Sequence, residues 1–302
     1  MATPVEAQRD LEHAGYLADE ELATVVHLAM ALDRPLLLEG DAGVGKTSLA
    51  LALAAVTGGP LIRLQCHEGI DAAQALYEWD HARQLLHLRA AEATGELAGH
   101  GSAEVEVELY SERFLIRRPL LEAISSPAGS PRPVLLVDEV DRADDEFEAF
   151  LLQLLSDYSV TIPELGTVRA EVVPIVVLTS NRTRDLHDAL KRRCLYHWVE
   201  HPDVEREVAI VRLRAPGVAA DVARQVAELS ARLRGLGLYK PPGVAETIDW
   251  AVAIALLGDG VTASAARSTL GTVVKYREDR DRVEAADFEG MVAAATGAVP
   301  GG

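Results

Sequence analysis

The stretch Gly40-Asp41-Ala42-Gly43-Val44-Gly45-Lys46-Thr47 lies between an apolar run, 35–38, and an alanine- and leucine-rich segment that begins at Ser48. The apolar run is typical of a short strand, and the segment after the stretch is a strong helix former. Glycines let the backbone wrap a polyphosphate with its amides pointing inward, and the start of the helix adds N–H groups and a partial positive charge. The stretch, together with Ser48, therefore predicts a phosphate-binding loop.

Lys46 and Thr47 give this loop its expected chemistry. The ammonium of Lys46 would reach the β and γ phosphates of ATP, and the hydroxyl of Thr47 would ligate Mg²⁺. A chance glycine-rich loop is the alternative interpretation. The filled motif and its strand and helix flanks favour the phosphate loop.

Composition limits the class of protein. The chain has 302 residues, of which 49% are hydrophobic, and a net charge of −18 from 47 acidic and 29 basic residues. This charge would repel nucleic acid and anionic membranes. Cys66 and Cys194 lie far apart, without a metal-type spacing, and are interpreted as buried thiols. Without a targeting segment or a long apolar span, the chain is expected to be cytoplasmic and to have no membrane segment.

Strands and helices are expected to alternate along most of the chain, which predicts an α/β fold with a parallel sheet covered by helices. We expect the nucleotide-binding core to span residues 1–212. Within it, 158–162 and 166–173 are predicted to form a hairpin. From about residue 213 to 302 the pattern is helical only, with turns that include 258–260, and it predicts a small all-α second domain.

Residues from about 67 to 118 are interpreted as an insertion in this core. The sequence from 71 to about 94 is helical in pattern, and glycines break that pattern between 95 and 101. The run Glu104-Val105-Glu106-Val107-Glu108-Leu109 alternates with period two, which predicts a half-exposed strand. The insertion is therefore expected to carry a small helix and a strand.

Asp138 and Glu139 follow a buried run, 134–137, at the point where parallel α/β sheets place ligands. Asp138 would hold Mg²⁺ through its water shell, and Glu139 would polarise the water that attacks the γ-phosphate. Paired acids are also common as solvated strand ends. The upstream phosphate loop favours the functional interpretation, with a spacing that lets this strand lie beside the first strand.

Asn181 ends the next apolar strand, where its amide would hold the attacking water. The alternative is a turn-forming asparagine before Arg182. Its position downstream of the acid pair favours the functional role.

Basic residues at two places are candidates for the same reaction. Lys191-Arg192-Arg193 would by default be a solvated surface cluster, but in a ring of subunits an arginine here would face the neighbour's nucleotide and stabilise transition-state charge. Arg267, near the start of a helix, would reach the phosphates of its own chain. The histidines have no ligand spacing and are interpreted as structural or surface residues.

With these parts in order, the chain resembles the AAA+ ATPases, and more closely their MoxR clade, which carries an insertion in the second helix of the core. The resemblance spans nearly the whole chain and is most specific in the combination of the phosphate loop with the insertion. It rests on the loop and on the following runs: Leu135-Leu136-Val137-Asp138-Glu139-Val140-Asp141-Arg142-Ala143, Thr179-Ser180-Asn181 and Leu190-Lys191-Arg192-Arg193.

The resemblance implies a role for each of these residues. Lys46 and Thr47 correspond to Walker A, Asp138 and Glu139 to Walker B, and Asn181 to sensor 1. Arg193, with Arg192 as the alternative, corresponds to the arginine finger. Many clade members have Ser-Pro-Arg at the second sensor, where this chain has Ser264-Ala265-Ala266-Arg267, so Arg267 is displaced by one position from the clade pattern.

Within the clade, the runs 64–69 and 75–80 look like the group associated with maturation of the molybdenum-copper carbon monoxide dehydrogenase. The resemblance implies a homo-oligomeric ring, a hexamer, with a metalloenzyme client and a partner that has a von Willebrand factor A domain. Clade relatives also activate rubisco or nitric oxide reductase. A nucleotide-controlled assembly scaffold with slow hydrolysis is a second hypothesis, and the acidic charge disfavours a DNA-linked motor.

Overall fold

The computed structural model of the chain describes residues 1–95, 101–258 and 260–297. The internal contacts of the chain define two compact units. The first contains Met1–Ala7, Glu20–Glu39 and Ala50–His197, and the second contains Gln8–Asp19, Gly40–Leu49 and the chain from Trp198 onward. The predicted glycine break at 95–101 and the predicted turn at 258–260 fall in part outside the described residues. The division at residue 212 stays a proposal.

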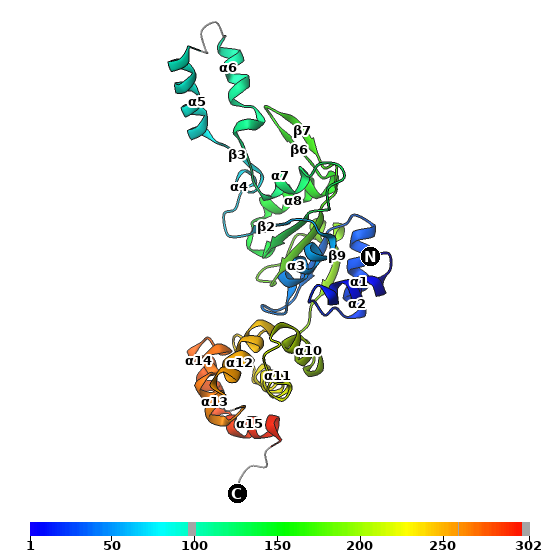
Figure 1. The fold of residues 1–302 in the computed structure, drawn as a ribbon, viewed down its shortest axis with the longest axis vertical. Helices are drawn as coiled ribbons and strands as arrows, with labels where there is room; N and C mark the ends of the chain where they lie inside the picture. The colour runs from blue at the N-terminus through cyan, green and yellow to red at the C-terminus, as the bar shows by residue number, and fades with distance from the viewer. Residues whose placement is uncertain (96–100, 259, 298–302) are drawn as a thin grey trace. The chain divides into compact units, whose positions relative to one another are not determined.

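A five-stranded sheet with the strand order β2-β5-β8-β1-β9 forms the centre of the first unit. Figure 1 labels β2 and β9 of this sheet among the surrounding helices. Its strands are β1 (Leu36–Glu39), β2 (Leu61–Gln65), β5 (Val134–Asp138), β8 (Ile175–Ser180) and β9 (Leu195–Trp198). Pairing is parallel between β1 and β8, β8 and β5, and β5 and β2. Every residue of β1, β5 and β8 is buried, as in a parallel sheet covered on both faces. The predicted α/β class is confirmed.

One expectation about strand order is wrong. The strand that ends in Asp138 does not lie beside the first strand, because β8 lies between β5 and β1. The residues of β8 are all buried, so this strand is suited to the middle of the sheet. The carboxyl ends of β5, β8 and β1 still meet at one edge, and that edge carries the polar residues of interest.

Helices flank this sheet, and the predicted hairpin is confirmed as β6 (Ser159–Ile162) and β7 (Gly166–Arg169), which pair antiparallel. Phe147, Leu151 and Leu154 on one face of α8 are buried in the core of the unit. Outside the insertion, the helices up to β9 are α1 (Pro4–His13), α2 (Glu20–Ala31), α3 (Lys46–Thr57), α7 (Pro119–Ile124), η2 (Val140–Arg142), α8 (Asp145–Asp157) and α9 (Asp188–Arg193).

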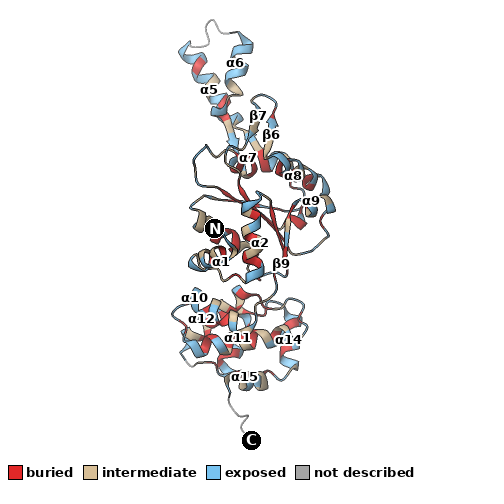
Figure 2. Cartoon of the chain, turned by 90° about the vertical axis from the view of Figure 1, so that its right-hand side faces the viewer, coloured by how far each residue is buried: buried red, intermediate tan, exposed pale blue. Residues whose placement is uncertain are grey.

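The insertion is a pair of helices on a two-stranded sheet, which we call the arm (Figure 1). Its elements are α4 (Ala72–Leu76), β3 (Tyr77–Trp79), α5 (His81–Thr94), α6 (Ser102–Leu109), η1 (Glu112–Phe114) and β4 (Leu115–Arg117). The helix expected from residue 71 to 94 is therefore interrupted by β3, which pairs antiparallel with β4. Figure 2 shows α5 and α6 largely exposed.

The strand predicted for Glu104 to Leu109 is wrong, because these residues form α6. A strand needs a neighbouring strand to supply backbone partners, whereas a helix satisfies its own hydrogen bonds. Two side chains of α5 hydrogen-bond to α6: the Gln84 amide donates to the Leu109 carbonyl, and His87 bonds to the Glu108 carboxylate. Glutamate has a high helix propensity. The alternation of glutamate with apolar residues is therefore compatible with a helix where the segment packs on α5.

The second unit has a helical core around the buried side chain of Trp250, whose indole N–H donates to Thr269 at 2.8 Å. Its helices after β9 are α10 (Val204–Arg214), α11 (Ala220–Arg234), α12 (Val244–Leu257), α13 (Ala263–Ser268), η3 (Leu270–Thr272), α14 (Arg277–Ala285) and α15 (Phe288–Thr296). The all-helical reading of this part of the chain is confirmed. None of the helices in the described ranges combines the length and hydrophobicity needed to cross a bilayer.

Candidate functional site

The predicted phosphate loop follows β1 directly and leads into α3. Gly43 and Gly45 have φ angles of 81° and 99°, a backbone region that side chains other than glycine rarely adopt. The buried ammonium of Lys46 donates to the carbonyls of Gly40 and Asp41, each at 2.7 Å. The loop therefore holds its lysine close, and the first turn of α3 supplies the amides of an anion site.

The start of α12 contacts this loop within the second unit, a contact that the sequence analysis did not predict. The amide of Val244 donates to the Gly43 carbonyl at 2.9 Å. A Cβ atom on Gly43 would meet the Cα of Gly243 at 2.9 Å and a carboxylate oxygen of Glu246 at 3.2 Å. That carboxylate oxygen is buried and has no hydrogen-bond partner among the described residues. Gly43 is therefore required by close packing as well as by its φ angle.

His201 and Arg234 lie in the same part of the second unit. His201 Nε2 is 3.6 Å from Asp41, and burial, followed by the charge of Arg234, lowers the pKa of this imidazole. Arg234 forms a two-pronged ion pair with the fully buried Glu207, at 2.6 and 2.8 Å, and donates to the Pro242 carbonyl just before α12. The buried pair thus supports the turn that contacts the loop.

Arg267 lies on α13, where its guanidinium is 3.4 Å from Glu289 and 5.7 Å above the ring of Phe288. The helix whose start contacts the loop is α12, and its first residue is Val244. A role for Arg267 at the phosphates stays a prediction.

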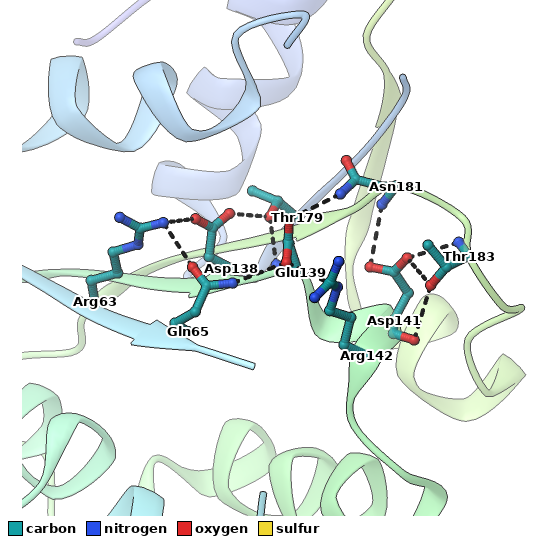
Figure 3. Close-up of polar contacts among 9 residues, drawn as sticks. All are labelled: Arg63, Gln65, Asp138, Glu139, Asp141, Arg142, Thr179, Asn181 and Thr183. Atoms are coloured by element: carbon teal, nitrogen blue, oxygen red, sulfur yellow. Dashed lines mark hydrogen bonds and ion pairs between the residues drawn. The ribbon is translucent and has the colours of Figure 1, made fainter. Parts of the chain in front are cut away.

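Asp138 and Glu139 are joined by the hydroxyl of Thr179 on β8 (Figure 3). This hydroxyl donates to Asp138 Oδ1 at 2.5 Å and accepts the Glu139 amide at 2.9 Å. Glu139 has a φ angle of 55°, which is uncommon for a residue other than glycine. Backbone strain of this kind is common at functional sites, and Thr179 holds both acids in place here.

Two side chains from β2 also hold the acids (Figure 3). Arg63 pairs with Asp138 at 2.6 Å, and Gln65 donates to Glu139 Oε2 at 3.2 Å. Arg142 approaches the same Glu139 oxygen at 3.1 Å. The sequence analysis missed these residues. The sequence signal for them was the polar residue Gln65 at the end of the apolar strand β2. In the sheet Gln65 is the register partner of Asp138.

Asn181 lies where the sequence analysis expected it, beside Glu139. Its amide nitrogen Nδ2 donates to Glu139 Oε1 at 3.3 Å, and its backbone amide donates to Asp141 at 3.2 Å. Asp141 is buried and also accepts the backbone amide and the hydroxyl of Thr183, at 2.8 and 2.7 Å. The structure therefore brings Asp138, Glu139 and Asn181 together and anchors the loop after β8.

Arg192 and Arg193 end α9 with exposed side chains. Arg34 donates to their backbone carbonyls at 2.8 and 3.1 Å. A cation at this end of a helix is favoured by the helix dipole. Arg34 thus holds the backbone of the arginine pair. The guanidinium groups of Arg192 and Arg193 form no ion pair with the residues that the structure describes.

Glu39, the last residue of β1, is a buried carboxylate next to the phosphate loop in sequence. It accepts the Tyr196 hydroxyl at 3.1 Å and lies 3.9 Å from the ammonium of Lys191 and 4.0 Å from the guanidinium of Arg182. These cations offset the cost of burying its charge. Glu39 thereby links the end of β1 to the residue after Asn181 and to the helix of the arginine pair.

The donor chemistry fits magnesium rather than a tightly caged metal. Among the described residues there is no cluster of three or more histidine, cysteine or acidic side chains able to hold a metal. Mg²⁺ is commonly bound through one or two carboxylates, waters and substrate phosphates. Asp138, at the end of β5 in the first unit, is an oxygen donor of this kind.

In this chain the first strand of a parallel sheet leads into a glycine-rich loop and a helix, and acids follow a later strand of the same sheet. This combination defines a P-loop nucleotide-binding protein. The chain belongs to the AAA domain family, dynein-related subfamily, whose family model matches residues 35–194. It is therefore an AAA+ ATPase, an enzyme that binds and hydrolyses ATP.

Proteins similar to this chain include a curated relative and a solved structure. Protein NorQ of Paracoccus denitrificans is 25% identical over 228 residues, which cover 73% of this chain and 72% of NorQ. A solved structure of a RuvB mutant of Thermotoga maritima has 15% sequence identity and a TM-score of 0.48, and covers 89% of this chain and 72% of that chain.

Proposed function

We propose that the chain is a MoxR-type AAA+ ATPase that assembles into a ring, a hexamer, and uses ATP hydrolysis to remodel a metalloenzyme during its maturation. The observation that carries the hydrolytic part is the placement of Glu139 Oε1 at 3.3 Å from the Asn181 amide while Gln65 and Arg142 hold Oε2. Glu139 Oε2 is thereby positioned by Gln65 and Arg142, and Oε1 faces the Asn181 amide, to which we assign the orientation of the attacking water.

ATP binding is assigned to the loop Gly40 to Ser48. Its amides and the start of α3 would receive the phosphates, and Lys46 would exchange its two loop carbonyls for phosphate oxygens. Thr47 and Asp138 would hold Mg²⁺, which supplies charge neutralisation at the β and γ phosphates.

Hydrolysis is assigned to Glu139 and Asn181. Asn181 would orient a water, and Glu139 would accept its proton as the water oxygen bonds to the γ-phosphorus and the bond to the ADP oxygen breaks. The negative charge that develops on the leaving ADP is neutralised by Lys46. Arg193, or Arg192, of a neighbouring chain would stabilise the charge of the transition state.

The client is proposed to be a metalloenzyme, in particular the molybdenum-copper carbon monoxide dehydrogenase, with a von Willebrand factor A domain protein as partner in the cytoplasm. The resemblance of runs 64–69 and 75–80 to this maturation group supports the carbon monoxide dehydrogenase client, and the match to NorQ supports the assignment to the clade. Activation of rubisco or nitric oxide reductase is the alternative within the same clade.

The hydrolytic assignment is tested with Glu139→Gln and Asn181→Ala. Because a general base contributes about 10²-fold or more, we expect Glu139→Gln to lower ATP turnover by at least about 10²-fold while it still binds ATP. Glu146→Gln, an exposed acid on α8, is the matched control and keeps wild-type turnover. Wild-type turnover in Glu139→Gln would show that another group activates the water.

A nucleotide-controlled scaffold is the second candidate, since a complete nucleotide site does not set a turnover rate. ATP turnover is measured for the protein alone and with the candidate von Willebrand factor A partner. Turnover that rises with the partner supports remodelling, and negligible turnover in both cases supports the scaffold. Salt-sensitive DNA binding at physiological ionic strength would instead favour a DNA-linked motor, against the charge of −18.

A further inference from the structure

A cavity of about 670 Å³ lies in the first unit, between the arm and the hairpin β6–β7. One side is formed by α4 and β3, and the other by α8 and β6. Its large apolar side chains are Leu76, Tyr77, Trp79, Phe150, Leu154 and Val160. The cavity is separate from the acids at the end of β5, so the ATPase chemistry gives it no role.

The arm presents an open strand edge to this cavity. Strand β3 belongs to a two-stranded sheet, so only one of its edges pairs with β4. The Leu76 carbonyl and the Asp80 amide bond to the β4 side, as Arg118 and Phe114 are their partners. Because backbone groups alternate along an antiparallel strand, the N–H and C=O groups of Tyr77 and Trp79 point to the other edge.

The hairpin presents a second open edge. Its two strands also form a sheet of their own, and the Tyr158 carbonyl accepts the Ala170 amide from the β7 side. The same alternation directs the backbone groups of Ser159 and Thr161 away from β7. Both of these residues line the cavity with Tyr77 and Trp79. Two strand edges, each able to pair with an added strand, therefore flank one apolar cavity.

The charged side chains that line the cavity are both acidic. Glu78 and Asp157 line it, and the described lining residues include no lysine, arginine or histidine. Two arginines outside the lining lie beside these acids: Arg118 pairs with Glu78, and Arg169 donates to the backbone carbonyl of Asp157 at 3.3 Å. The Asp157 side chain is exposed at the end of α8. Burial raises the pKa of the Tyr77 phenol, and the charge of Glu164 in the hairpin turn raises it further. Cationic groups would be attracted to this position.

We propose that this cavity is a binding groove for an extended peptide segment of a partner protein, with a bulky apolar side chain flanked by lysine or arginine. The segment adds as a strand to the edge of β3 or β6, and its apolar side chain fills the space between Trp79 and Val160. Main-chain pairing supplies affinity and the pocket supplies specificity, as in other cases of strand addition. The proposal does not depend on how ATP is hydrolysed.

The test begins with a phage library of random twelve-residue peptides selected on the full-length wild-type protein at physiological salt. Enriched peptides are synthesised with a fluorophore, and their Kd is measured by fluorescence anisotropy. We expect the enriched peptides to share an aromatic or large aliphatic residue with lysine or arginine on either side. Failure to enrich any such sequence overturns the proposal.

Two matched variants locate the binding site. Asp157→Lys reverses a charge that lines the cavity, and Glu92→Lys makes the same change at the exposed end of α5, outside the cavity lining. Both place a cation at a helix C-terminus, which a helix tolerates well. We expect Asp157→Lys to weaken peptide binding about tenfold or more and Glu92→Lys to leave it unchanged. Equal binding to both variants would place the peptide elsewhere.

Backbone pairing is tested on the peptide itself. N-methylation of alternate peptide amides removes donors from one edge of the bound strand, so one of the two alternate methylation patterns should weaken binding about tenfold and the other much less. Equal tolerance of both patterns contradicts strand addition. If a capped single tryptophan binds as tightly as the peptide, the cavity is a small-molecule site and the proposal is wrong.

Discussion

The hydroxyl of Thr179 connects the two acids to which we assign Mg²⁺ binding and hydrolysis, since it donates to Asp138 and accepts the Glu139 amide. Thr179→Val keeps the shape of the side chain but removes the hydroxyl that bonds to both acids, and losing a hydrogen-bond partner of a buried polar group costs about 1–3 kcal/mol. We expect the kcat for ATP to fall at least about tenfold with little change in ATP affinity. Thr57→Val is the control, because its hydroxyl bonds to carbonyls within α3 and to the Gly59 amide and contacts neither acid. An unchanged kcat in Thr179→Val would show that the acids are positioned without it.

His201 gives the second unit a pH-dependent stability. Its pKa is lowered in the folded protein, first by burial and then by Arg234, so the folded state prefers the neutral imidazole. The unfolded chain binds the proton more readily, and the stability from His201 is present above about pH 6.5 and is lost as pH falls through the folded pKa. We expect the difference in unfolding free energy between wild type and His201→Gln to shrink or reverse between pH 7.5 and 5. A constant difference across that range would contradict this assignment.

Residues whose type and spacing match a known motif could be proposed for the site from sequence. Lys46, Asp138, Glu139 and Asn181 each stand in a recognisable local context. Arg63, Gln65 and Thr179 could not be predicted in the same way, because their roles arise from strand register. Gln65 meets Asp138 only because β2 and β5 pair in parallel, and these residues lie 73 positions apart.

At the scale of single elements, α9 and its contact with Arg34 make the next prediction. The Arg34 guanidinium binds the carbonyls at the end of α9 from which Arg192 and Arg193 project. Arg34→Ala leaves those carbonyls without this partner and loosens the last turn of a helix only six residues long. We expect ATP turnover to fall several-fold while the affinity for ATP stays within about twofold.

Two controls sharpen this prediction. Arg34→Lys retains a cation but not the planar fork that reaches several carbonyls, so it should recover only part of the turnover. Arg9→Ala, which removes a pair with Asp10 on α1, should have no effect on turnover. If Arg34→Ala and wild type hydrolyse ATP at the same rate, α9 does not need this anchor.

Most of the secondary structure outside the insertion follows local sequence, since strands such as β5 and β8 are buried along their whole length and helices such as α8 bury one apolar face. The exceptions have a common cause in packing partners that sequence does not name. Glu104 to Leu109 alternates like a strand but forms α6 beside α5, and the helix expected from 71 to 94 gives way to β3 where β4 returns beside it. In both cases the neighbouring segment decides the conformation.

At the scale of the whole molecule, both cysteines are buried, as expected from their isolation in the sequence. Burial raises the pKa of Cys66 and of Cys194 to about 12, and the charge of Asp138 adds to the effect at Cys66. Because the thiolate is the reactive form, we expect neither thiol to react with Ellman's reagent at pH 8 in the native protein, and both to react in guanidinium. Rapid reaction of either thiol in the native protein would contradict the described packing.

Ring assembly is a proposal at the same scale, and it makes the ATP site a joint product of two chains. Lys46→Ala removes the phosphate-binding side chain, and the double variant Arg192→Ala, Arg193→Ala removes the arginine pair. Each variant alone should hydrolyse ATP at no more than about one hundredth of the wild-type rate. In a mixed ring, an intact loop from one variant can meet an intact arginine pair from the other.

The most direct test is the ATP turnover of these two variants after they are mixed in equal amounts and allowed to exchange subunits. Random assembly gives an intact loop at half of the sites, and half of those have an intact neighbour, so turnover should recover to about a quarter of the wild-type value. Turnover that stays at the level of the separate variants would contradict a site shared between chains. Full wild-type turnover by either variant alone would contradict the site itself.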